Sequence, residues 1–95
     1  MSNTPGGKVT KAQAEARLKK FDTDLSQFDD IQLLAKIAEA DPPTLYVLQQ
    51  IISESIHYVK VINGKFDQTL LPSNIERFCV AMYWNDLYGP NRKVN

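Results

Sequence analysis

The sequence predicts an all-α protein, a compact bundle of three or four helices with flexible N- and C-terminal tails. Apolar residues recur with helical spacing along most of the chain. Helix-start residues precede these stretches, and proline or glycine closes most of them. With 95 residues, the chain can build one modest core. We therefore divide it into a flexible tail (1–9), a single helical domain (10–90) and a basic tail (91–95).

The first helix is predicted over residues 11–21. Thr10 and Gln13 have the spacing of a capping box, in which each side chain bonds the other residue's backbone amide. The helix is rich in alanine, and its apolar seam consists of Ala14, Leu18 and Phe21. A helix this weakly amphipathic is marginal alone and must dock on another element.

The second helix is predicted over residues 27–40. Ser26 and Asp29 resemble a capping box at its start, and the Asp41-Pro42-Pro43 run ends it, because a residue before proline avoids the helical conformation. Its helical spacing predicts that it buries Phe28, Ile31, Leu34 and Ala38, with Leu33 and Ile37 alongside.

The third helix is predicted over residues 43–62, with Asp41 as its cap and Pro42 in its first position. Its apolar row consists of Leu45, Leu48, Ile52, Ile56 and Val59. This is the longest and most apolar helix, and we expect it at the centre of the core. Asn63-Gly64 ends it. An alternative interpretation makes Asn63-Gly64 the turn of a β-hairpin.

The fourth helix is predicted over residues 74–88, after a loop at 65–72. Ser73 and Glu76 form a capping box in the sequence, and Gly89-Pro90 ends the helix. At 100° per residue, Ile75, Phe78, Cys79 and Met82 share one face. A second apolar face, well over 100° away, holds Val80, Tyr83, Trp84 and Leu87.

Two explanations of this second face remain open. Either the first helix or the loop at Phe66, Leu70 and Leu71 covers it, or it contacts another molecule. We favour the intermolecular contact, because the first helix is a poor lid and because tryptophan, tyrosine and methionine are enriched in interface cores.

Charge is balanced overall but segregated along the chain. Residues 1–20 carry a net charge of +4 and residues 21–41 a net charge of −5. The basic arm can contact phosphate groups or an acidic partner, or pair with the acidic segment beside it. Its residues are Lys8, Lys11, Arg17, Lys19 and Lys20.

No motif carries a recognisable enzymatic chemistry. The single histidine, His57, lies with Ser53 and Glu54 on the polar side of the third helix, without the shaped pocket that a catalytic triad requires. The aspartates after Phe21 fail the calcium-loop pattern, since Gln27 replaces the required glycine. Cys79 is expected to be a small buried hydrophobe. We expect no cofactor, no metal and no small-molecule substrate.

These observations favour a non-enzymatic protein–protein interaction or assembly module, an accessory protein that forms a homo-oligomer through its last helix. The alternative is a dimeric nucleic-acid-associated protein that uses the basic arm. No apolar run is long enough to span a membrane, and the lone cysteine fits a reducing compartment, so we expect a cytoplasmic protein.

Overall fold

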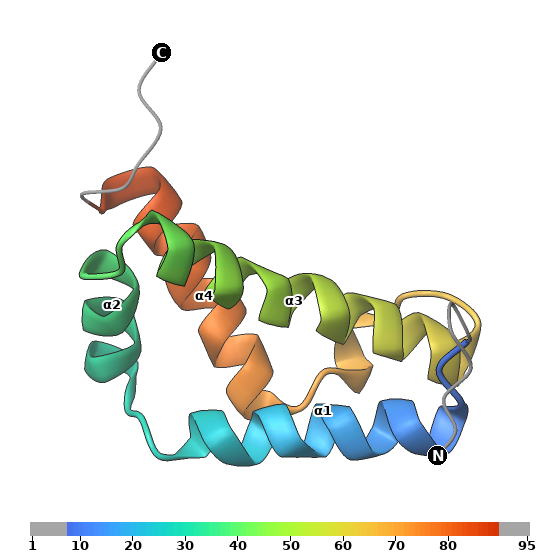
Figure 1. The fold of residues 1–95 in the computed structure, drawn as a ribbon. Helices are drawn as coiled ribbons and strands as arrows, with labels where there is room; N and C mark the ends of the chain where they lie inside the picture. The colour runs from blue at the N-terminus through green and yellow to red at the C-terminus, as the bar shows by residue number, and fades with distance from the viewer. Residues whose placement is uncertain (1–7, 90–95) are drawn as a thin grey trace.

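The computed structural model describes residues 8–89, so residues 1–7 of the predicted N-terminal tail (1–9) and all of the predicted C-terminal tail (91–95) lie outside the described residues. It confirms the all-α class (Figure 1). No strand occurs in the described part, so the hairpin interpretation of Asn63-Gly64 is wrong. The elements are α1 (Lys11–Ser26), α2 (Asp30–Ala38), α3 (Pro42–Asn63), the short 3-10 helix η1 (Gln68–Leu70) and α4 (Ser73–Tyr88).

The last helix, and not α3, lies at the centre of the fold. In Figure 1, α1 and α3 run side by side, and α4 starts next to α1 and passes α3 to reach α2. The helix α4 contacts α1, α2 and, more lightly, α3, whereas α3 packs mainly on α1. The expectation that α3 is central is therefore wrong. The apolar composition of α3 did not place it at the centre, because part of its apolar surface, including Tyr46 and Val47, is exposed.

Local signals set the start of α1 and both ends of α3 as predicted, whereas α1 extends beyond its predicted end at residue 21. The Thr10 hydroxyl accepts a hydrogen bond from the Gln13 amide at 3.1 Å, and the Gln13 side chain accepts one from the Thr10 amide at 3.0 Å. Asp41 caps α3 by accepting from the Thr44 amide, and hydrogen bonds from Thr44 lower the pKa of this carboxyl. Gly64 ends α3 with φ of 87°, a left-handed conformation that favours glycine.

The structure corrects the start and the face of α2. The helix is capped by Asp29 with Gln32, while α1 continues to Ser26, whose hydroxyl donates to the Thr23 carbonyl. The residues that α2 buries completely are Leu33 and Ile37, whereas Ile31 is 77% exposed and Leu34 40% exposed. Helix α2 carries two adjacent apolar rows, one with Ile31 and Leu34 and the other with Leu33 and Ile37. Phe28 lies outside the helix, and the row that faces α4, Leu33 and Ile37, is the buried one.

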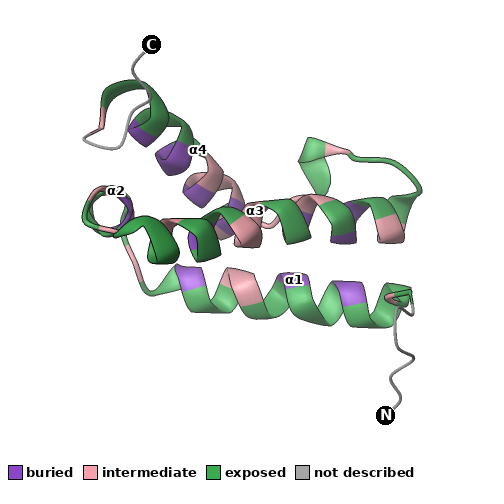
Figure 2. Cartoon of the chain, turned by 45° about the horizontal axis from the view of Figure 1, so that its top comes forward, coloured by how far each residue is buried: buried purple, intermediate pink, exposed green. Residues whose placement is uncertain are grey.

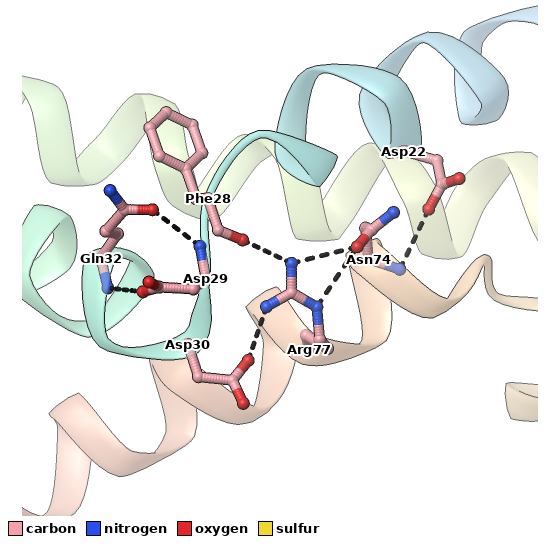
Figure 3. A network of polar contacts seen from close by, with 7 residues as sticks. All are labelled: Asp22, Phe28, Asp29, Asp30, Gln32, Asn74 and Arg77. Carbon is pink, nitrogen blue, oxygen red and sulfur yellow. Dashed lines mark hydrogen bonds and ion pairs between the residues drawn. The ribbon is translucent and has the colours of Figure 1, made fainter.

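The predicted capping box at the start of α4 is also wrong. Pro72 occupies the cap position and has no side chain that could accept a hydrogen bond. The carboxylate of Asp22 in α1 instead accepts from the Asn74 amide at 3.0 Å (Figure 3). A carboxylate at a helix N-terminus also interacts favourably with the helix dipole. A side chain from a different helix thus performs the capping.

Arg77 connects α4 to the segment between α1 and α2. Its guanidinium donates to the Phe28 carbonyl at 2.7 Å, to the Asn74 side-chain oxygen, and to the Asp30 carboxylate (Figure 3). The Arg77 side chain is 31% exposed and the Asp30 side chain 79% exposed. Solvent therefore screens the ion pair, and the bond to the half-buried Phe28 carbonyl contributes more to holding the connection in place.

The core is apolar with a conspicuous polar exception on α4. Phe78, Ile75, Leu33 and Ile37 are among its largest fully buried side chains. Asn85 is only 3% exposed, and neither its side-chain nitrogen nor its oxygen has a hydrogen-bond partner within the described residues. Burial of an unsatisfied amide destabilises a folded protein.

We predict that Arg77→Met lowers the free energy of unfolding by about 1–3 kcal/mol, because it leaves the Phe28 carbonyl and the Asn74 side chain without their donor. Urea denaturation measures the change. The control is Lys20→Met, which removes the exposed Lys20–Asp24 ion pair and should cost less than about 1 kcal/mol. Equal effects of the two substitutions would refute a special role for Arg77.

We predict that Asn85→Leu raises the free energy of unfolding by about 1–2 kcal/mol, because a side chain of similar size replaces an amide that has no partner. The same denaturation measurement tests it. A loss of stability of similar size would show that the Asn85 amide is hydrogen-bonded in solution.

Candidate functional site

The outward side of α4 carries a stripe of large exposed apolar residues. We call Val80, Tyr83, Trp84 and Leu87 the outer stripe; their exposed fractions are 53%, 64%, 53% and 45%. The opposite side of α4 holds the buried residues Ile75, Phe78 and Met82, as the sequence predicts, with Cys79 half-buried at its edge. In Figure 2, buried residues recur along α4, and most of its exposed residues lie in its C-terminal half.

A groove of about 560 Å³ runs along the outer stripe on the side of α2. We call it the α2/α4 groove. Leu34 and Asp30 line it from α2, and α4 lines it from Ser73 to Trp84, with Val80 and Ala81 between them. Its lining is mostly apolar, with Asp30, Glu76 and Arg77 as its charged residues. Sequence reasoning missed this groove because it assigned Leu34 to the core.

A second groove, of about 340 Å³, follows the other side of the outer stripe. Ile52 and Ile56 of α3 and Phe66 and Leu71 of the loop line it together with Val80 and Tyr83. The loop therefore borders the outer stripe without covering it, and all four residues of the stripe remain about half exposed. The outer stripe thus forms a ridge between the two grooves.

The apolar surface continues to the end of α4 through Tyr88, which is 66% exposed. The rings of Trp84 and Tyr88 lie 4.8 Å apart, centroid to centroid, at an angle of 47°. Together with Leu34 and Ala38 they line a hollow of about 200 Å³ above Asn85. Tyr88 is one helical turn from Trp84, and this spacing could have revealed it in the sequence.

The basic arm divides into residues with and without intramolecular partners. The Arg17 guanidinium donates to the Tyr58 hydroxyl at 3.1 Å and lies over its ring, and Lys20 pairs with Asp24. Burial raises the pKa of Tyr58 despite the adjacent arginine. Lys8, Lys11 and Lys19 are exposed. Lys8 precedes α1, and the other four residues are distributed along it.

The acidic segment has mainly structural tasks. Asp22 caps α4, Asp29 caps α2, Asp41 caps α3 and Asp30 pairs with Arg77. Pairing between the basic arm and this segment is limited, in the described residues, to Lys20 with Asp24. The charge segregation seen in the sequence thus arises largely from helix capping.

The polar group around His57 lies on an exposed side of α3. His57, Ser53 and Glu54 are all exposed, and Glu54 accepts a hydrogen bond from Tyr58 at 2.9 Å. The rings of His57 and Tyr58 lie 5.8 Å apart, centroid to centroid. Within residues 8–89, histidine, cysteine and acidic side chains form no cluster able to hold a metal ion.

Comparison with known proteins finds no matching family model, no similar curated protein and no similar solved structure. None of the helices in the described part of the chain is both long enough and apolar enough to cross a membrane. Inference about function therefore rests on the surface geometry.

Burial, and to a smaller extent the negative charge of Glu76, raises the pKa of the Cys79 thiol. Little of the reactive thiolate forms at neutral pH. We predict that Cys79 reacts several-fold more slowly with a thiol reagent at pH 7.5 than in urea-unfolded protein, measured by the release of a coloured thiolate. Equal rates would show that the side chain is freely accessible.

Proposed function

We propose that this protein is a protein–protein interaction or assembly module that forms a homo-oligomer, most simply a twofold dimer, through the outer stripe of α4. The supporting observation is that the helix at the centre of the fold leaves four large apolar side chains about half exposed in one continuous stripe. Contiguous apolar surface of this kind marks interaction sites in many proteins.

The available area suits an interface. Tyr83, Trp84 and Tyr88 are 64%, 53% and 66% exposed. At roughly 150–250 Å² per aromatic side chain, they alone leave roughly 300–450 Å² of mostly apolar surface open to water. A standard interface buries about 800 Å² per partner, of which somewhat more than half is apolar. The three rings supply much of the apolar part, and Val80 and Leu87 supply more.

The chemistry of the stripe also favours protein contact. Tryptophan and tyrosine dominate the energetically important positions of interfaces, where neighbouring residues exclude water around them. Trp84 lies in the middle of the exposed surface, with Val80 one turn before it and Tyr88 one turn after it. We therefore assign Trp84 the largest share of the binding energy. The reducing, cytoplasmic setting of this proposal rests on the single cysteine.

We predict that Trp84→Ala weakens self-association at least about tenfold, because it removes the central ring of the contact. Light scattering coupled to size exclusion gives the mass over a range of concentrations. The matched control is Tyr46→Ala on α3, which removes an aromatic side chain of similar exposure, 62%, that lines neither groove beside the outer stripe. It should leave the mass unchanged.

Two outcomes would overturn the proposal. One is a wild-type protein that stays monomeric at every concentration measured. The other is a Trp84→Ala variant whose mass matches the wild type while its helix content is preserved.

A further inference from the structure

We infer that two copies associate with their α4 helices antiparallel, so that the outer stripe of each lies along the α2/α4 groove of the other. This inference rests on the proposed function and deepens it. It names a second copy of this chain as the occupant of the groove, gives the orientation of the helices, and adds Leu34 of α2 to the interface.

The outer stripe has the spacing of a helix that binds in a groove. Val80, Tyr83, Trp84 and Leu87 stand at positions i, i+3, i+4 and i+7. Helices that dock in apolar grooves present anchors with this spacing. The same chain thus carries both the inserting side chains and, next to them, a groove that can receive a helix.

The groove can receive part of such a helix. Along α4 it extends from Ser73 to Trp84, which is about 16 Å at 1.5 Å per residue. The stripe of a partner helix lies over the C-terminal part of this length, where Val80 and Trp84 line the groove. Leu34 is 40% exposed at the α2 wall of the groove. Its exposure is accounted for if an apolar helix from a second copy covers it.

A twofold axis between the two copies makes both stripe-to-groove contacts identical. Because Val80 and Trp84 line the groove and also belong to the outer stripe, each copy gives and receives the same contact, as an isologous interface requires. Two helices related by a twofold axis perpendicular to them run antiparallel. With the axis near the middle of the stripe, Val80 of one copy lies opposite Leu87 of the other.

The first test compares two substitutions on opposite sides of the outer stripe. Leu34→Lys changes the wall of the α2/α4 groove, and Phe66→Lys changes the groove on the α3 side. The two residues are almost equally exposed, at 40% and 38%. In the monomer, Asp30 and Glu76 can accommodate a lysine at position 34.

We expect Leu34→Lys to raise the dissociation constant of the dimer at least about tenfold and Phe66→Lys to change it less than about threefold. Sedimentation velocity measures both, and circular dichroism verifies that each variant is folded.

The second test determines the orientation by disulfide trapping in a Cys79→Ala background. Val80→Cys protein and Leu87→Cys protein are oxidised separately and as a mixture. The antiparallel arrangement gives a covalent dimer chiefly in the mixture. Efficient cross-linking of Val80→Cys protein with itself would indicate a parallel contact and overturn the inference.

The failure of this inference can be distinguished from the failure of the proposed function. If Trp84→Ala dissociates the protein while Leu34→Lys does not, the stripe is the contact and the α2/α4 groove is not the receptor. If Phe66→Lys has the larger effect, the partner occupies the α3 side. A wild-type protein that is monomeric throughout overturns both.

Discussion

The donation of hydrogen bonds by Arg77 fixes the position of α2, and the candidate site depends on that position. The guanidinium reaches the Phe28 carbonyl just before α2 and the Asp30 carboxylate in its first turn. Because α2 is only nine residues long, it has little packing area of its own. Held at its first turn, it can bury Leu33 and Ile37 against α4 and leave Leu34 at the wall of the groove. The groove thus results from a polar contact at one end and apolar packing along the rest of α2.

The second constraint is the small size of the chain. A chain of 95 residues buries a smaller fraction of its surface on folding than a larger protein does. Here α1, α2 and α3 cover the inner side of α4, and no described element covers the outer side. The aromatic and aliphatic residues of that outer side are costly to leave in water. The proposed intermolecular contact would remove this cost without adding length to the chain.

The sequence predicts those features that depend on neighbouring residues. The capping box at Thr10, the Asp41 cap and the Gly64 stop are local, and each is found where the pattern indicates. The two faces of α4 also follow from its own periodicity. Features set by distant residues were predicted wrongly. Capping of α4 depends on Asp22, which lies 52 positions away from Asn74, and no pattern around Ser73 indicates it.

The face of α2 illustrates the same limit and explains why only half of the candidate site could be predicted. Its two apolar rows are nearly equivalent in sequence, and contact with α4 decides which one is buried. Choosing the wrong row as the buried one assigns Leu34 to the core, whereas the structure places it at the surface. The outer stripe was therefore visible in the sequence, because it depends on one helix. The groove beside it was not, because it needs the relative placement of two helices.

The geometry of the aromatic residues lowers the entropic cost of a contact at this surface. Trp84 and Tyr88 rest against each other with ring centroids 4.8 Å apart, and Trp84 also lines the α2/α4 groove. Each ring has only two side-chain torsions, and contact with a neighbour restricts them before any partner arrives. Binding then loses less side-chain freedom than it would with long flexible residues, so more of the free energy of apolar burial remains available for association.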